Sequence, residues 1–234
     1  MKTIVVLMLL VSGIAQAQGL LTNESEAGIA AANGNTKTQT FNFKQLNDYK
    51  WDMNVASFRS RYLNARANGV ETARFFMGGL RYERQVSSHF GLFVGETLEK
   101  DKFAGIDERL ITDLGGKYRF IESANTKLFS ELGYRYMHEE RLDDTKAFSN
   151  YGRAYSEWEH KWNANFSTKY WAEYLANFTE HKDWQFNTEL SLSAVLSTMF
   201  SLKSGILLRY DHLPAPGILY KTDTLFTTAL VAKF

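Results

Sequence analysis

The sequence predicts an all-β protein: a single antiparallel transmembrane β-barrel of about twelve strands, after a cleaved signal peptide. Three observations lead to this prediction. Apolar and polar residues alternate through most of the chain. The connections between alternating segments are tight at one end and longer at the other. The first residues have the composition of an export signal.

The N-terminus has the features of a secretory leader. A basic residue is followed by an apolar run over residues 4–14 and then by small residues at Ala15 and Ala17. This spacing matches the small-x-small pattern that signal peptidase cleaves, and the run is too short for a permanent membrane helix. We therefore expect residues 1–17 to be a signal peptide and residues 18–234 to form the barrel domain.

Composition excludes other classes of protein. No later stretch contains the ~18 apolar residues that a spanning helix needs. Cleavage removes one lysine and leaves equal numbers of basic and acidic residues, so nucleic acid is not an expected partner. Cysteine is absent, so no disulfide can hold the fold. The mean hydropathy of −0.32 is compatible with a membrane barrel, because only the outward face of each strand must be apolar.

Twelve segments show the alternation and are bounded by turn residues. It is clearest in the second half of the chain, for example at Phe186, Leu190 and Leu192 against the polar residues between them. Around Trp51 the apolar residues change parity, which predicts a bulge or a misplaced boundary. The first, fifth and eighth segments alternate weakly. The expected strands are 23–33, 37–49, 51–65, 70–86, 89–99, 107–120, 126–139, 148–162, 164–179, 184–198, 200–212 and 219–234.

The connections differ in length between the two ends of the predicted barrel. YKWD, VSSH, ESANT, KWNAN and STMFS are tight, whereas ARANGVE, EKDKFAGIDE, HEERLDDTKAFSN and DHLPAPGILYKTD are longer; NGNT and TEHKD on the longer side are short. An even strand number with this asymmetry is typical of outer-membrane barrels with both termini in the periplasm. Pro214 and Pro216 share one loop, and a closed barrel has no edge strand for a proline.

Aromatic residues near segment ends fit the girdles of a membrane barrel. They are Trp51, Tyr82, Phe90, Tyr118, Phe120, Trp162, Trp184, Phe200, Tyr210 and Tyr220. The alternative is a soluble β-sandwich, whose strands also alternate. The segments are longer than the ~5–6 residues of ordinary strands, and no second apolar surface is available to pack against them.

Charged residues of both signs lie on the face opposite the apolar one. We expect the following residues to line the lumen: Arg81, Glu83, Asp113, Lys117, Arg119, Glu131, Arg135, Lys169, Glu173, Glu189, Lys203, Arg209, Asp211, Lys221 and Asp223. Two interpretations stay open. The lumen is either a narrow passive pore with weak ion selectivity or a salt-bridged interior that only supports the wall.

The chain ends in an alternating apolar set that finishes on an aromatic residue, with Phe226, Leu230 and Phe234 as its members. We expect this set to be the signal that the barrel-assembly machinery reads during biogenesis, through pairing of the final strand. The other expected partners are outer-membrane lipid and lipopolysaccharide. The oligomeric state cannot be read from the sequence.

An alternative function is a barrel enzyme of lipase or protease type, with a site at the extracellular rim. Asp211-His212 is the best protease-like pair, with Asp143 and Asp144 as partners, but no histidine is followed two residues later by serine. The loop residues His138, Glu139, Glu140, Asp143 and Asp144 could hold Ca²⁺, although loop carboxylates are usually only hydrated. We therefore assign no catalytic, metal or cofactor-binding residue.

Four stretches, residues 25–40, 101–120, 128–142 and 213–234, resemble the salt-induced outer-membrane protein family, a domain of unknown function in Gram-negative bacteria. In this chain Ala32 and Asn33 precede the sequence GNT at residues 34–36, where members of that family often have a serine or threonine. The resemblance implies the barrel fold and the outer membrane of a Gram-negative bacterium as the location. Its name suggests a structural response to osmotic stress, and it brings no known reaction.

Overall fold

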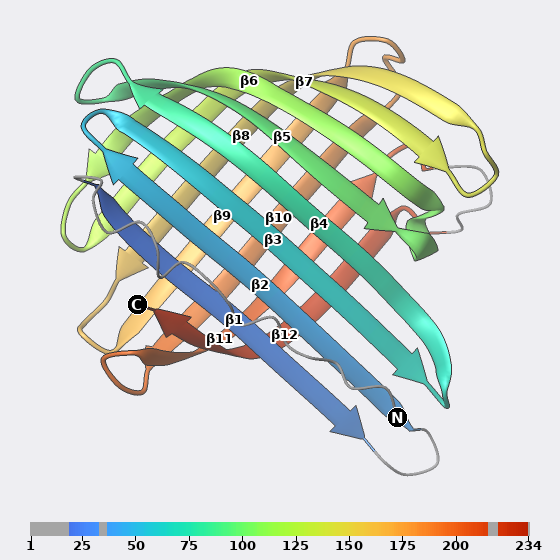
Figure 1. The fold of residues 1–234 in the computed structure, drawn as a ribbon, viewed down its shortest axis with the longest axis horizontal. Helices are drawn as coiled ribbons and strands as arrows, with labels where there is room; N and C mark the ends of the chain where they lie inside the picture. The colour runs from blue at the N-terminus through green and yellow to red at the C-terminus, as the bar shows by residue number, and fades with distance from the viewer. Residues whose placement is uncertain (1–18, 33–36, 215–219, 234) are drawn as a thin grey trace.

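The computed structural model describes residues 19–32, 37–214 and 220–233. They form a closed barrel in which every strand pairs antiparallel with its neighbours in the chain and β12 pairs with β1 (Figure 1). The predicted fold class is confirmed. The expected cleavage site at Ala15 and Ala17 and the final Phe234 lie outside the described residues.

The twelve strands are 12 to 17 residues long, which is enough to cross a membrane at a tilt. They are β1 (Leu20–Ala32), β2 (Thr38–Trp51), β3 (Asn54–Ala67), β4 (Val70–Gln85), β5 (Phe90–Asp101), β6 (Ile106–Glu122), β7 (Thr126–Arg141), β8 (Lys146–Lys161), β9 (Phe166–Asn177), β10 (Trp184–Val195), β11 (Phe200–Asp211) and β12 (Thr222–Lys233). A three-residue 3₁₀ helix, η1 (Lys102–Ala104), follows β5. Within the described ranges no helix is long and apolar enough to cross a membrane.

The connections lie at two ends, which we call the turn end and the loop end. The turn end, on the left in Figure 1, carries the start of β1, the end of β12 and the connections 52–53, 86–89, 123–125, 162–165 and 196–199. The loop end carries the connections 68–69, 102–105, 142–145 and 178–183, together with the end of β1 and the start of β12. The expected tight connections are therefore all found at the end where the chain enters and leaves the barrel.

The expectation of long loops at the other end is wrong for three of the four connections. ARANGVE is a two-residue hairpin turn, in which Asn68 and Gly69 both have positive φ, 50° and 82°. In EKDKFAGIDE and HEERLDDTKAFSN the strands continue to Asp101 and Arg141. Their charged residues suggested solvated loops, but Glu99 and Glu139 instead face the barrel interior and pair there with Arg109.

The parity change near Trp51 comes from a misplaced boundary. Trp51 is the last residue of β2 and pairs with Asn54 across a two-residue turn, so the third strand is not 51–65. The ladder between β2 and β3 runs without a register shift. Asp52 in the turn has a φ of 48°, a conformation that aspartate tolerates better than most residues.

The two faces of the barrel have the predicted composition. In β10 the outward Leu190 is 48% exposed, whereas the inward Glu189 and Ser191 are 9% and 3% exposed. In a membrane the outward side chains contact lipid, while each strand's backbone hydrogen bonds are made within the closed sheet. The apolar surface of the protein is therefore outside and the polar surface inside.

Aromatic side chains form a band near each end of the barrel. At the turn end Trp51 stacks between Tyr49 and Tyr82, with ring centroids 5.3 and 6.2 Å apart. At the loop end Trp184 contacts the ring of Tyr210 at 4.8 Å. Such bands are typical of the two membrane interfaces. Tyr210 and Tyr220, both expected in a girdle, also lie in the lining of the central cavity near the loop end.

The closing seam between β1 and β12 is the shortest ladder of the described barrel. It has four residue pairs, from Glu24↔Lys233 to Ala27↔Leu230, all toward the turn end, whereas β11 and β12 pair over eleven. Ion pairs reinforce it: Lys233 Nζ lies 2.9 Å from Glu24 Oε2. Phe226 and Leu230 of β12 face outward and are exposed.

The face assignment predicts different effects for two arginine substitutions on β10. Leu190→Arg places a charge in lipid near mid-strand and should destabilise the barrel by ~2–4 kcal/mol. Asn187→Arg places the same side chain in the cavity beside Glu173, so we expect little loss of stability. The measurement is guanidinium unfolding of the barrel in phospholipid vesicles, followed by tryptophan fluorescence. Equal losses for both variants would contradict the assignment.

Candidate functional site

An elongated cavity of about 1010 Å³ lies in the barrel interior. Every strand contributes to its lining. Lys127 and Glu159 line it near the turn end, and Tyr220 and Lys221 line it near the loop end. The cavity therefore reaches toward both ends of the barrel.

All the residues expected on the inward face lie in the lining of this cavity. These are Arg81, Glu83, Asp113, Lys117, Arg119, Glu131, Arg135, Lys169, Glu173, Glu189, Lys203, Arg209, Asp211, Lys221 and Asp223. Other charged residues of the lining were missed, including Glu26, Arg61, Glu99 and Arg153. They belong to the first, third, fifth and eighth expected strands. Apolar and polar residues alternate only weakly there, so the sequence did not show which residues face inward.

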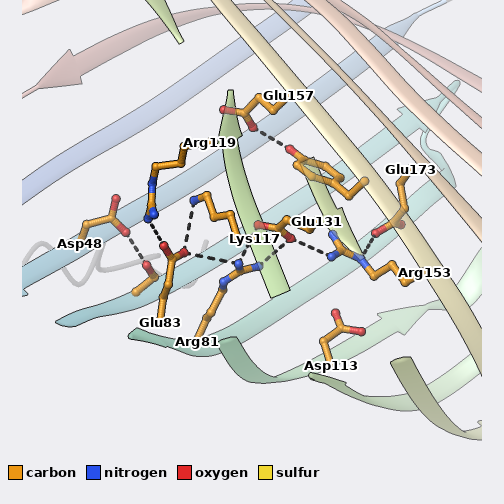
Figure 2. Close-up of polar contacts among 12 residues, drawn as sticks. Asp48, Arg81, Glu83, Asp113, Lys117, Arg119, Glu131, Arg153, Glu157 and Glu173 are labelled. Atoms are coloured by element: carbon orange, nitrogen blue, oxygen red, sulfur yellow. Dashed lines mark hydrogen bonds and ion pairs between the residues drawn. The ribbon is translucent and has the colours of Figure 1, made fainter. Parts of the chain in front are cut away.

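Glu131 is the centre of an ion-pair network along the wall from β4 to β9 (Figure 2). Arg81 donates two hydrogen bonds to it, at 2.7 and 3.1 Å, and Arg153 donates a third at 2.8 Å. The carboxylate is 97% buried, since Glu131 is only 3% exposed. Bidentate guanidinium–carboxylate pairs are among the strongest hydrogen bonds in proteins.

The network extends in both directions from Glu131. Toward the turn end Glu83 accepts from Lys117 at 3.2 Å and from Arg119. Toward the loop end Arg153 also donates to Glu173 at 2.6 Å, and Arg135 links Glu173 to Asp113. Acids and bases alternate along it, so each buried charge has an opposite neighbour.

A glycine lets Arg81 on β4 reach Glu131 three strands away. Arg81 lies over the ring of Phe93, 3.9 Å from its centroid, and Phe93 lies over Gly115 of β6. A Cβ at Gly115 would lie 2.9 Å from Phe93 Cζ and 2.4 Å from the carbonyl oxygen of Leu132. Only glycine leaves room for this ring, which supports the guanidinium through a cation–π contact.

A second group of charges spans the closing seam, and we call it the seam cluster: Glu26, Lys44, Glu189 and Lys203. Glu26 on β1 lies 3.3 Å from Lys44 on β2 and 3.0 Å from Lys203 on β11. Each lysine also lies 3.7 Å from Glu189 on β10. Side-chain ion pairs therefore connect strands on both sides of the seam, where the backbone ladder is short.

The residues between 138 and 144 that could hold a cation do not all lie on one face of the barrel wall. Glu139 pairs inside the barrel with Arg109 and Arg141, while His138 stacks outside on Phe148 at 4.5 Å. Thr145 donates to Asp143 in the 142–145 loop and lowers the pKa of this carboxyl. In the part of the chain that the structure describes, no three histidine, aspartate or glutamate residues are arranged for a metal ion.

Asp211 and His212 also face different directions. Asp211 lines the cavity and accepts a hydrogen bond from the backbone N–H of Leu213 at 2.9 Å. His212 stacks on Trp184 at 5.2 Å, and its Nδ1 lies 2.9 Å from the Tyr210 hydroxyl. The two residues that suggested a protease-like pair do not contact each other through their side chains in the described hydrogen bonds.

Comparison with known proteins identifies the family. Residues 25–234 match the family model described as "Protein of unknown function, DUF481". The chain belongs to the DUF481 family. No curated protein matches the chain. Membership in this family extends over nearly the whole barrel domain and assigns no activity.

Solved structures show the same fold. The COG4313 outer membrane channel from Pseudomonas putida F1 has a TM-score of 0.57 and 10% identity, covering 97% of this chain and 100% of the channel. The NanC porin has a TM-score of 0.52 and 8% identity, covering 91% of this chain and 97% of the porin. At such identities the likeness concerns the fold alone.

The wall network predicts an unequal response to two charge-neutralising substitutions. Glu131→Gln leaves Arg81 and Arg153 facing each other without the carboxylate between them, so we expect a loss of ~3–5 kcal/mol. Glu108→Gln removes the exposed partner of Lys100 and should change stability little. Guanidinium unfolding in vesicles measures both. A Glu131→Gln barrel as stable as the parent would show that the network contributes no stability.

Proposed function

We propose that this protein is a narrow passive pore in the outer membrane of a Gram-negative bacterium. The observation that carries the proposal is the cavity of about 1010 Å³, which has charged walls and lining residues near both ends. Extended along a hydrocarbon core of about 30 Å, this volume makes a narrow passage that suits ions and small solutes.

The arrangement of the ion pairs favours a pore over a filled interior. The charges of the wall network belong to β4 to β9, so the network covers one side of the interior and leaves the cavity beside it. Charged walls hydrate an aqueous path, and lumen residues determine selectivity in barrels. The same ion pairs also stabilise the wall, so a structural role in the envelope accompanies the pore.

Location and biogenesis form part of the proposal. The porin-like fold supports the outer membrane, and residues 1–17 have the features of an export signal. Recognition of Phe226, Leu230 and Phe234 by the assembly machinery, and contact with lipopolysaccharide, stay predictions. A role in osmotic stress, as the salt-induced family name suggests, stays a prediction too.

Among the contacts of the described residues, none favours the enzyme alternative. Hydroxyl groups lie 2.8 Å from ring nitrogens in two places, at Ser88–His89 and at Thr126–His160. Among the described hydrogen bonds neither histidine has a carboxylate on its other nitrogen. A hydroxyl nucleophile needs both a base and a group that orients it.

The absence of cysteine permits a direct test of the pore. Thr97 of β5 lines the cavity, whereas Val94 of the same strand faces outward and is 48% exposed. In planar bilayers we expect the parent protein to conduct. A cationic methanethiosulfonate reagent should reduce the current of Thr97→Cys and leave that of Val94→Cys unchanged.

Two outcomes would contradict the pore. A correctly folded parent protein that does not conduct in the bilayer would favour a wall-supporting interior. Equal block of both cysteine variants would show that the current does not pass through the cavity. Folding is checked in each case by heat-modifiable migration of the barrel.

A further inference from the structure

The cavity arginines without a described ion pair are Arg59, Arg61 and Arg209, and two of them, Arg61 and Arg209, share one contact. Most cavity arginines are ion-paired with carboxylates: Arg81, Arg109, Arg119, Arg135, Arg141 and Arg153. Arg61 and Arg209 instead contact the ring of Phe75, with Cζ atoms 5.4 and 4.8 Å from its centroid. Within the described ranges neither makes an ion pair, and Arg61 Nε is buried without a hydrogen-bond partner.

The two guanidinium groups come from different parts of the barrel. Arg61 is on β3, next to Phe75 on β4, whereas Arg209 is on β11. The strands β12, β1 and β2 separate β11 from β3 around the wall. Arg209 therefore reaches across this part of the interior, and both positive groups meet at one ring inside the cavity.

The surrounding charges neutralise this pair only in part. Arg209 lies directly opposite Asp223 in the β11–β12 ladder, but the described contacts include no ion pair between them. Arg61 lies directly opposite Lys44 in the β2–β3 ladder, and like charges opposite each other are destabilising. Lys44 already shares Glu26 and Glu189 with Lys203 in the seam cluster. The two glutamates and two lysines of the seam cluster therefore balance each other in charge. Arg61 and Arg209 add positive charge beside them.

The carboxylates on the neighbouring strand β5 are engaged elsewhere. Glu99 lies 3.4 Å from Arg109. Asp101 accepts hydrogen bonds from the backbone N–H groups of Phe103 and Ala104, at 3.2 and 3.1 Å, and caps η1. Neither carboxylate forms an ion pair with Arg61 or Arg209 in the described contacts.

We propose that Arg61 and Arg209 form a binding site for an oxyanion, such as the carboxylate, sulfate or phosphate group of a small solute in the lumen. The guanidinium fork binds such groups through two parallel hydrogen bonds. Phe75, 5% exposed, lies beneath both guanidinium groups and supports them. An anion between them relieves the repulsion that the protein's own side chains leave. This inference rests on the proposed function for its role in transport and names the solute class.

The test measures binding without conduction. Sulfate is titrated into the folded, detergent-solubilised barrel at constant ionic strength, and the midpoint of thermal unfolding is recorded. The parent should show a saturable rise. Arg61→Gln and Arg209→Gln should each weaken sulfate binding about tenfold or more, as expected for the loss of one charge-assisted contact. Arg209→Lys keeps the positive charge but lacks the guanidinium group that makes two parallel hydrogen bonds. This variant should bind sulfate with intermediate affinity.

Arg59→Gln is the matched control. Arg59 lies two residues before Arg61 on β3 and lines the same cavity, but it is exposed and makes no described contact with Phe75. This variant loses the same charge, so a general electrostatic effect should weaken binding equally in all three glutamine variants. We expect it to bind sulfate within about twofold of the parent.

The site and the pore can fail separately. Sulfate binding that depends on Arg61 and Arg209 in a barrel that does not conduct would uphold the site and overturn the pore. A conducting barrel that shows no saturable sulfate effect, or one that is equal in all variants, would overturn the site alone. Heat-modifiable migration of each variant establishes that it is folded before binding is compared.

Discussion

The structure depends on one constraint: a closed β-sheet in a membrane places every second side chain in lipid and the others in a common interior. The outward set must be apolar, so the polar residues of the chain gather inside. Charges concentrated there are tolerated only when paired or hydrated. The ion pairs around Glu131 and across the seam are the consequence. Gly115 has no side chain and so leaves room for the Phe93 ring, over which Arg81 reaches Glu131 three strands away.

At the seam the barrel is closed both by backbone pairing and by side-chain ion pairs. Four ladder pairs join β1 to β12, and the charges of Glu26 and Lys203 connect the strands on either side. The remaining interior combines ion-paired walls with Arg61 and Arg209, which meet at Phe75 and make no described ion pair. The residues that stabilise the barrel and the residues proposed to contact solute are therefore different members of one inward-facing set.

The fold was readable from the sequence because alternation is local: Phe186, Leu190 and their neighbours identify an outward face without knowledge of any partner. The ends of strands were less readable, since charged inward residues such as Glu99 and Glu139 resemble loop residues in composition. The sequence does not show which charged residues form ion pairs with each other. Arg81 and Glu131 are fifty residues apart in sequence, and nothing local distinguishes this pair from the unpaired Arg209. The Asp211-His212 motif failed because the Asp211 side chain lines the cavity, whereas His212, just beyond the end of β11, stacks on Trp184.

In this barrel one face of each strand contacts lipid while the other lines a water-filled interior. Nitroxide labels on single cysteines at Val94, Leu190, Thr97 and Asn187, in the barrel in lipid vesicles, test this arrangement through collision with oxygen and with a water-soluble nickel chelate. We expect the labels at Val94 and Leu190 to respond mainly to oxygen, and those at Thr97 and Asn187 to respond mainly to the chelate. Labels at Thr97 and Asn187 that neither reagent reaches would contradict it and indicate a packed, dry interior.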